Sequence, residues 1–468
     1  GSGSTTGSIA STSISNAGLL ILNRSDNTAN LSSIISGSGH LIQIGTGTYI
    51  LSGINTYTGS TVVSSGILRA SNAAALGNTS TGTIVLSGAA LEITTSINAE
   101  PLILNGTGIS SGGALRNISG NNSYAGAITQ VSASRINSDS GTLTLDVASG
   151  SAVTGTYNIT FGGSGNITVA DPVAISTGTL TKDGSGTLTL SGANTYTGLT
   201  TVSAGALTAA NNTALGTVAG GVTVVDGAAL QLSGGITIGA EALTLNGDGI
   251  SSGGALRNVS GNNTYQGTID ISGSASGVRI NSDSGTLTIS GNITNGGVYF
   301  VLGGAGNITV SGIIGNGAGQ VYKADSGTLI LSGANSYTGL TTVAGGVLRA
   351  SNNTALGTTA GGVTVSAGAA LELSGSITIG AEALTLNGSG ISSGGALRNV
   401  SGDNTYQGAV TQASASRINS DSGTLTLDVA SGNGITGTFN LTFGGSGNVT
   451  VSDPIATSSG TLTKDGSG

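Results

Sequence analysis

Residues 186–198 read Gly-Thr-Leu-Thr-Leu-Ser-Gly-Ala-Asn-Thr-Tyr-Thr-Gly, and this segment predicts the secondary structure of much of the chain. Leu188 and Leu190 alternate with Thr187 and Thr189, which places the leucines on one face of an extended strand and the hydroxyls on the other. We expect the leucines to point into a core and the threonines to face solvent. The Ser-Gly-Ala-Asn that follows consists of turn residues, so the strand is short.

The composition of the 468-residue chain extends this prediction to its full length. Gly accounts for 85 residues, and the chain has no Cys, Met or Trp. An abundance of Gly, Ser, Thr and Asn disfavours long helices. The hydrophobic fraction of 37% provides a core and argues against disorder, while the absence of a Gly-X-Y period excludes collagen. An all-β protein is the prediction.

Internal repeats organise the chain. The pentapeptide Gly-Ala-Leu-Arg-Asn occurs at 113–117, 254–258 and 395–399, so a superrepeat of about 141 residues is present. Three lysines, Lys182, Lys323 and Lys464, have the same spacing. We predict a diverged partial repeat followed by three superrepeats in one continuous structure. Their ranges are 1–46, 47–185, 186–326 and 327–468.

Two architectures explain short strands at regular spacing: an array of separate sandwiches or barrels, and a solenoid. Separate domains would require linkers, and no segment rich in Pro or charge interrupts the chain. In a solenoid, equivalent side chains stack at about 4.8 Å, so a repeated charge would repel itself. Only 7% of the residues are charged. We therefore predict an elongated rod, a single parallel β-solenoid.

Four segments carry a resemblance to a known family: 186–198, Leu199 to Leu207, Ala214-Leu-Gly216 and Gly227 to Leu232. They resemble the passenger-associated, or autotransporter-associated, β-strand repeat of Gram-negative surface proteins. The resemblance implies a right-handed parallel β-helix, secreted to the cell surface as the stalk of an adhesin or another large exoprotein. We expect the chain to be one window of a longer array or filament, joined end to end to adjoining repeats or to copies of itself.

Six tyrosines recur in the motif Ser-Gly-x-Asn-[Ser/Thr]-Tyr-x-Gly. We interpret them as structural anchors that pin a corner, because Asn, Ser and Gly are turn residues. A sugar-stacking surface is the alternative, since a tyrosine ring offers an apolar face and a polar tip. The six are Tyr57, Tyr124, Tyr196, Tyr265, Tyr337 and Tyr406.

Three arginines each precede an aspartate at the fourth following position, which places both side chains on one face of an extended strand. We predict a structural ion pair in each case, with a ligand-binding role as the alternative. The pairs are Arg135 with Asp139, Arg279 with Asp283 and Arg417 with Asp421.

Catalysis is weakly supported by the sequence. Ser138-Asp139-Ser140-Gly141 resembles a serine-protease motif, but a serine nucleophile needs a nearby base and the chain has one histidine, His40. The best carboxylate pair for a sugar-cleaving enzyme, Asp139 with Asp146, is broken in the second superrepeat, where Ser290 replaces the second acid. Calcium-binding and phosphate-binding motifs are likewise absent from the sequence. We predict no catalytic residue, metal site or cofactor.

These observations predict a non-catalytic stalk or fibre segment at the surface of a Gram-negative bacterium. The alternative function is a glycan- or matrix-binding face, which could contact a host or neighbouring cell, and the third is a polysaccharide-active enzyme. A formal net charge of −8 argues against nucleic acid as a partner, and no apolar run reaches the length of a membrane-spanning helix.

Overall fold

The computed structural model describes residues 9, 11–27, 29–315 and 317–468. The chain is a right-handed parallel β-solenoid, which confirms the predicted fold class. Helical structure in the described residues is limited to three short 3-10 turns, η1 (Ile109–Ser111), η2 (Ile250–Ser252) and η3 (Ile391–Ser393). The contacts divide the chain into two compact units, Gly1–Leu230 and Gln231–Gly468. The predicted superrepeat borders stay a prediction.

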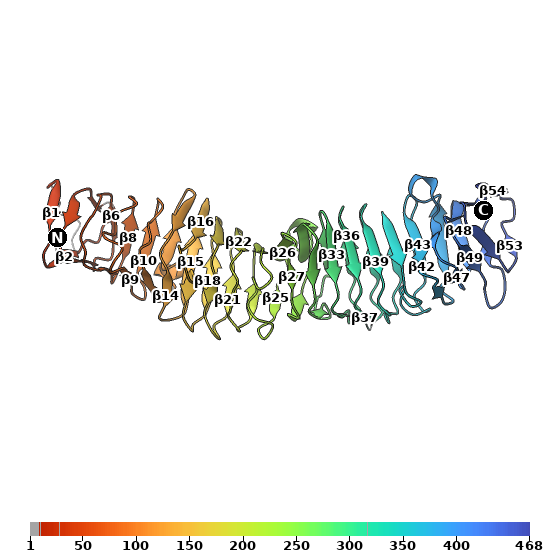
Figure 1. Cartoon of the computed structure of the whole chain (residues 1–468), viewed down its shortest axis with the longest axis horizontal. Helices are drawn as coiled ribbons and strands as arrows, with labels where there is room; N and C mark the ends of the chain where they lie inside the picture. Colours follow the sequence, from red (N-terminus) through yellow and green to blue (C-terminus); the bar gives the residue numbers. More distant parts are fainter. Residues whose placement is uncertain (1–8, 10, 28, 316) are drawn as a thin grey trace. The chain divides into compact units, whose positions relative to one another are not determined.

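The N-terminal unit is built from three parallel sheets, to which successive coils of the chain each add a strand (Figure 1). Its first sheet contains β2 (Leu19–Leu22), β5 (His40–Gln43), β7 (Thr61–Val63), β9 (Thr83–Val85), β11 (Leu102–Leu104), β14 (Ile128–Gln130), β17 (Val153–Thr154) and β20 (Val173–Ala174). Its second sheet contains β3 (Ala29–Leu31), β6 (Thr48–Leu51), β8 (Ile67–Ala70), β10 (Ala90–Ile93), β12 (Leu115–Asn117), β15 (Ser134–Ser138), β18 (Ile159–Gly162), β21 (Leu180–Lys182), β23 (Thr200–Val202) and β25 (Val222–Val224). Its third sheet contains β13 (Asn122–Tyr124), β16 (Thr142–Leu145), β19 (Asn166–Val169), β22 (Thr187–Leu190) and β24 (Ala206–Ala209). β1 (Ser13–Ser15) pairs with β4 (Ile34–Ser36), and β26 (Ala229–Ser233) contains the border of the unit.

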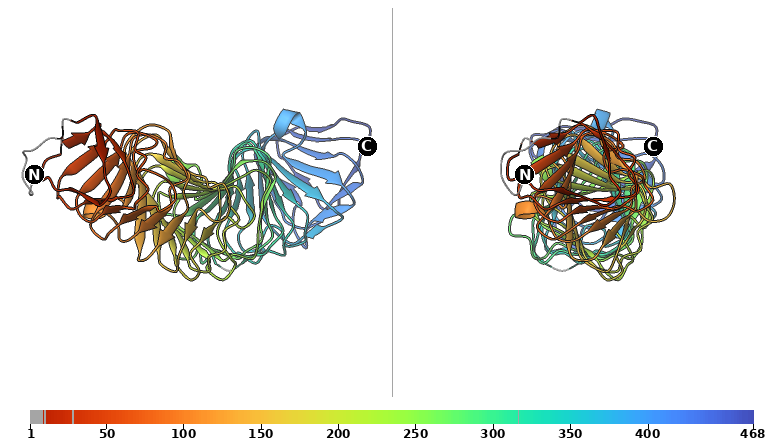
Figure 2. Two further views of the ribbon diagram at one scale, coloured as in Figure 1. Left: turned by 60° about the vertical axis from the view of Figure 1, so that its left-hand side comes forward. Right: turned by 90° about the vertical axis from the view of Figure 1, so that its left-hand side faces the viewer.

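The C-terminal unit also consists of strands that pair in parallel from coil to coil (Figure 2). One ladder contains β29 (Leu256–Ser260), β32 (Val278–Ser282), β35 (Phe300–Gly303), β38 (Val321–Lys323), β40 (Thr341–Val343), β42 (Val363–Val365), β45 (Leu384–Gly388), β48 (Val410–Ser420), β50 (Ile435–Thr436) and β53 (Ile455–Ala456). A second contains β27 (Thr237–Ile238), β30 (Asn263–Tyr265), β33 (Thr286–Ile289), β36 (Asn307–Val310), β39 (Thr328–Leu331), β41 (Val347–Ala350), β43 (Ala370–Ser374) and β46 (Leu397–Ser401). β48 also pairs with β46, and it continues to β51 (Leu441–Gly444) and β54 (Leu462–Lys464). Two shorter ladders contain β28 (Leu243–Leu245), β31 (Ile269–Asp270), β34 (Ile293–Thr294) and β37 (Ile314–Gly315), and β44 (Thr378–Ile379), β47 (Asn404–Tyr406), β49 (Thr424–Leu427) and β52 (Asn448–Val451).

The core consists of the alternate apolar residues of these strands. Leu188 and Leu190 of β22 are fully buried, whereas Thr187 and Thr189 are partly exposed. The predicted face assignment is therefore confirmed. The length of one coil varies: Leu188 pairs with Leu207 on the next coil, whereas Thr237 pairs with the more distant Thr264. Loops between the strands absorb this variation while the inward pattern is kept.

Equivalent strands of consecutive superrepeats lie in different sheets. β7 (Thr-Val-Val) belongs to the first sheet of the N-terminal unit, whereas its equivalent in the next superrepeat, β23 (Thr-Thr-Val), belongs to the second. The following strands, β8 and β24, are likewise displaced from the second sheet to the third. A superrepeat therefore does not contain a whole number of coils.

Candidate functional site

In three of its six copies, the asparagine of the Asn-[Ser/Thr]-Tyr motif joins three successive coils. Asn55, which is 3% exposed, accepts a hydrogen bond from the backbone N–H of Ile35 at 2.9 Å and donates one to the carbonyl of Ala75 at 2.6 Å. Because the side chain reaches both neighbouring coils, it satisfies buried backbone groups where the strands are interrupted. The same pair of bonds is made by Asn194 and Asn335.

All six motif tyrosines are buried, with 0% exposure. The Tyr196 hydroxyl lies 2.7 Å from the Thr200 hydroxyl, and Gly216 of the Ala-Leu-Gly segment packs on its ring. A Cβ on Gly216 would lie 2.9 Å from two ring carbons, and its φ of +90° also requires glycine. Rings without exposed surface cannot stack on a sugar, so that alternative fails for these six. Their role as anchors of the repeat stays a prediction.

A glutamate that the sequence analysis did not single out is buried beside these tyrosines. Glu100 is 2% exposed, and Thr83 Oγ1 donates a hydrogen bond to its Oε1 at 3.1 Å. Within the described residues its other oxygen has no partner, and burial raises the pKa of Glu100 to about 7. The pKa of Glu382 is raised to about 7 by the same cause. The sequence contains a signal for this site, because Glu100, Glu241 and Glu382 recur with the spacing of the superrepeat. All three are buried in the structure.

Two of the three recurring lysines, Lys182 and Lys323, are buried and bond neighbouring coils together. Lys182 is 2% exposed, and its Nζ donates to the carbonyls of Asp183, Gly184 and Ala204 at 2.7–3.0 Å. Burial lowers the pKa of Lys182 to about 8. Lys323 makes the equivalent three bonds, so each ammonium closes a corner between two coils.

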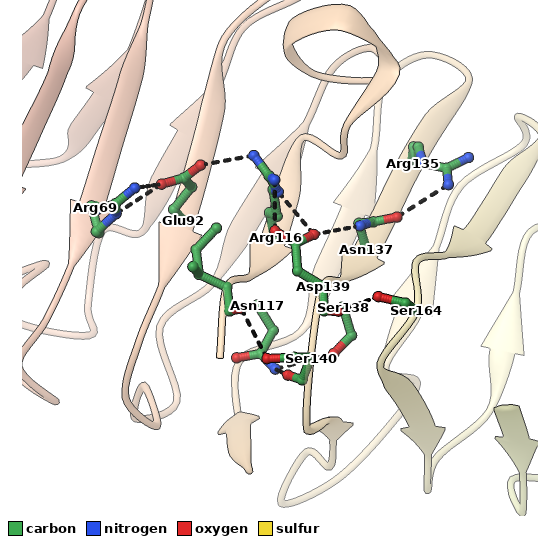
Figure 3. A network of polar contacts seen from close by, with 11 residues as sticks. Arg69, Glu92, Arg116, Asn117, Arg135, Asn137, Ser138, Asp139, Ser140 and Ser164 are labelled. Atoms are coloured by element: carbon green, nitrogen blue, oxygen red, sulfur yellow. Dashed lines mark hydrogen bonds and ion pairs between the residues drawn. The ribbon is translucent and has the colours of Figure 1, made fainter. Parts of the chain in front are cut away.

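A network of charged side chains crosses the coils of the second sheet (Figure 3). Glu92, which is 1% exposed, accepts hydrogen bonds from Arg69 and Arg116, and Arg116 also pairs with Asp139. Side chains of opposite charge therefore meet on adjacent coils. They attract each other, whereas the same charge repeated on every coil would repel. The C-terminal unit contains the same network in Arg349, Glu372, Arg398 and Asp421.

The predicted pairing of Arg135 with Asp139 is corrected by the structure. Arg135 instead pairs with Asp183, two coils further along the chain, and Asp139 pairs with Arg116. Residues at positions i and i+4 of an extended strand are separated by about 13 Å, whereas neighbouring coils are about 4.8 Å apart. In the same way Arg279 pairs with Asp325 rather than Asp283, and Arg417 pairs with Asp465 rather than Asp421.

The long Arg–Asp pairs cross an intervening coil at a glycine. A Cβ on Gly162 would lie 2.1 Å from Arg135 Nη2 and 2.1 Å from Asp183 Oδ1. The backbone of Gly162 has no positive φ, so the space above the residue, not its conformation, requires glycine. Gly303 and Gly444 occupy the equivalent positions below the other two pairs.

The Ser138-Asp139-Ser140 motif is part of the structural network. Ser138 is fully buried and accepts a hydrogen bond from Asn117 Nδ2 at 3.1 Å, and Ser140 Oγ donates to the carbonyl of Ile118. Asp139 is bound by Arg116, and His40 lies on β5 against Ser60. The arrangement is that of a turn rather than of an activated nucleophile.

Two negative findings concern the described residues alone. Within residues 9, 11–27, 29–315 and 317–468, no group of three or more His, Asp or Glu side chains is placed to hold a metal ion. In the same residues, no helix has the length and apolar character needed to cross a membrane.

The geometry defines a solenoid whose recurring polar residues bond one coil to the next. Three segments, residues 41–70, 180–209 and 321–350, match the passenger-associated-transport-repeat, which confirms the predicted resemblance. No curated protein and no solved structure gave a significant match. The repeat and the fold together fit a structural or adhesin-like autotransporter passenger.

Proposed function

We propose that this chain is a non-catalytic structural segment, a stalk or fibre, of a protein on the surface of a Gram-negative bacterium. The observation that supports this function most directly is the use of the recurring polar side chains. The asparagines, the buried lysines and the Arg–Glu–Arg–Asp networks all join neighbouring coils. The passenger-associated repeat supports secretion to the cell surface.

The proposal also covers the partners of this chain, which are adjoining repeats or further copies of the chain itself. Coil-to-coil backbone pairing and side-chain bonding do not depend on position along the array, so they serve equally between these coils and adjoining repeats. A chain that contains such repeats in tandem gains length without a new interface. We therefore propose end-to-end contact with adjoining repeats or with further copies.

An in-frame deletion tests the structural role. Residues 186–326 form one predicted superrepeat, and their removal should leave a folded solenoid that is shorter by roughly six coils, or about 30 Å. The chain would be placed between an outer-membrane anchor and a fluorescent reporter, and the distance of the reporter from the membrane would be measured by energy transfer. Replacement of Thr201 and Thr223 by Ser is the matched control, with no change in distance. An unchanged distance in the deletion variant would contradict the stalk.

One observation favours the alternative of a glycan-binding face. Three aromatic rings in the same loop of the repeat are exposed: Tyr157 and Phe439, which are at equivalent positions, and Tyr299, which is one position further along, at 45%, 41% and 43%. In the second superrepeat Tyr299 lies beside Tyr322, with ring centroids 5.7 Å apart. Exposed rings of this kind stack on sugars. Binding to an immobilised glycan panel that disappears when Tyr299 and Tyr322 become Thr would support this function, and binding retained by that variant would exclude these rings.

A further inference from the structure

One face of the N-terminal unit carries a column of apolar side chains that point away from the core. The residues Ile21, Ile42, Val62, Ile84 and Ile103 are direct strand partners on β2, β5, β7, β9 and β11. Each step of the column corresponds to one coil, so the side chains are about 4.8 Å apart. Five consecutive rungs are therefore apolar on the outside of the first sheet.

These side chains are accessible. Ile21 is 51% exposed and Ile103 is 36% exposed, while the three between them are partly exposed. Outward positions two residues away add Leu19 on β2, Ile44 directly after β5 and Leu86 directly after β9, at 57%, 39% and 38%. We call these eight residues the apolar face. Its exposed area is on the order of a few hundred Å², which is the size of the largest apolar patch on a typical monomer, and that patch often has a function.

The fold does not require apolar residues in this column. At the positions equivalent to Val62, Ile84 and Ile103, the second and third superrepeats carry threonine, and those threonines also lie on neighbouring strands. They are Thr201, Thr223 and Thr244, and Thr342, Thr364 and Thr385. Within the first sheet itself the column continues beyond Ile103 as Thr129 and Thr154. The isoleucines and valine are thus a property of the first five rungs, not of the repeat.

The electrostatics of the apolar face favour a neutral partner surface. Among the described residues, the five column positions and the outward positions two residues before and after each of them contain no Asp, Glu, Lys or Arg. The chain as a whole carries a formal net charge of −8, so two copies repel each other at long range. Salt screens that repulsion but does not weaken contact between uncharged faces.

We propose that the apolar face is a docking surface for the same face of a second copy of this chain. Two β-sheets pack about 10 Å apart with interdigitating side chains, which requires equal rung spacing in both partners. A second copy has that spacing by construction, and a two-fold axis brings each column against its equivalent. The area is below the roughly 800 Å² per partner of a stable complex. The pairing is therefore weak and takes effect where copies are concentrated. This inference does not rest on the proposed stalk function.

Sedimentation velocity of the full chain tests the proposal, with concentrations from ~10 μM to ~1 mM, the range in which weak association is populated. The wild-type protein should shift toward a dimer as concentration rises, and more so at high salt. The triple variant Val62→Thr, Ile84→Thr, Ile103→Thr should stay monomeric, because it has the threonines of the other superrepeats. The matched control, Thr201→Ser with Thr223→Ser, should behave as wild type. A wild-type monomer at every concentration, or equal association of the triple variant, would overturn the proposal.

Crosslinking gives a second readout that separates this contact from end-to-end association. The chain has no cysteine, so Ile84→Cys and Thr223→Cys each introduce a single thiol at equivalent positions. Ile84→Cys should form a disulfide-linked dimer rapidly under mild oxidation, and Thr223→Cys should form it at least tenfold more slowly. Equal rates would refute face-to-face pairing, even if the triple variant were to lose its fold.

Discussion

Replacing Glu100 by Gln removes a buried carboxyl group whose pKa is raised by burial and lowered only by the hydrogen bond from Thr83. The titratable groups that face it are Tyr57 and Tyr124, both buried. Gln keeps an oxygen that can accept the hydrogen bond from Thr83. The variant therefore changes the ionisation of the site while leaving its size and its main contact in place.

The effect on stability depends on pH, and its sign follows from the raised pKa. The ordinary value for Glu is 4.5, and Glu100 in the folded chain titrates with a pKa of about 7. Below pH 4.5 the group is protonated in both the folded and unfolded states. As pH rises toward and through 7 the folded state loses stability, because it must ionise a carboxyl group that the unfolded state ionises more readily. Since one pH unit corresponds to ~1.4 kcal/mol, the loss at about pH 8 amounts to at most ~3 kcal/mol for this site.

Hydrogen exchange of the full chain measures this change locally, at the amides of β9 and β11, after correction for the intrinsic effect of pH on exchange. Wild-type opening should become easier between about pH 5 and pH 8, and Glu100→Gln should remove most of that slope. Glu92→Gln is the control, because it takes a hydrogen-bond acceptor from Arg69 and Arg116 and should weaken the second sheet at both pH values. An unchanged slope in Glu100→Gln would show that this carboxyl does not control the local stability.

Three further predictions concern the packing and the backbone, and each is tested by substitution. Leu190→Asp buries an unpaired charge and should prevent folding or cost more than ~4 kcal/mol, whereas Thr189→Asp should change stability by less than ~1 kcal/mol; equal melting temperatures would invalidate the face assignment. Gly162→Ala should break the Arg–Asp pair above it and cost ~1–2 kcal/mol in chemical denaturation, and a crystal structure that retains the pair would contradict the steric argument. Ser110 has a φ of +49°, so Ser110→Gly should raise the melting temperature and Ser110→Val should lower it, while the reverse order would exclude strain at this turn.

The fold could be predicted from the sequence because its main signal is local. The alternation at 187–190 predicts which side chains are buried, and stacking of neutral side chains explains the low charge. Partners in neighbouring coils could not be predicted in the same way. Asp183 lies far along the chain from Arg135, and the unequal lengths of the coils conceal which residues meet.

In the candidate site, too, the local motifs could be predicted from the sequence but the contacts between coils could not. The motif predicts the recurring tyrosines, but their burial also depends on residues of the next coil, such as Gly216 against the ring of Tyr196. Glu100 recurs as Glu241 and Glu382 in the motif Ala-Glu-x-Leu-x-Leu-Asn-Gly, but the motif does not show that the carboxyl group is buried. The raised pKa of Glu100 comes from its burial, which depends on how the coils pack together.

The displacement of equivalent strands from one sheet to the next bears on what a tandem array can display. A surface feature encoded at one position of the repeat, such as the outward position occupied by Val62 in one superrepeat and by Thr201 in the next, points in a different direction in each copy. Duplication of a superrepeat therefore places that feature on a different face of the solenoid in each successive copy. Such an array would offer the same chemistry to neighbours on several sides, whichever way the chain happens to be turned about its own axis.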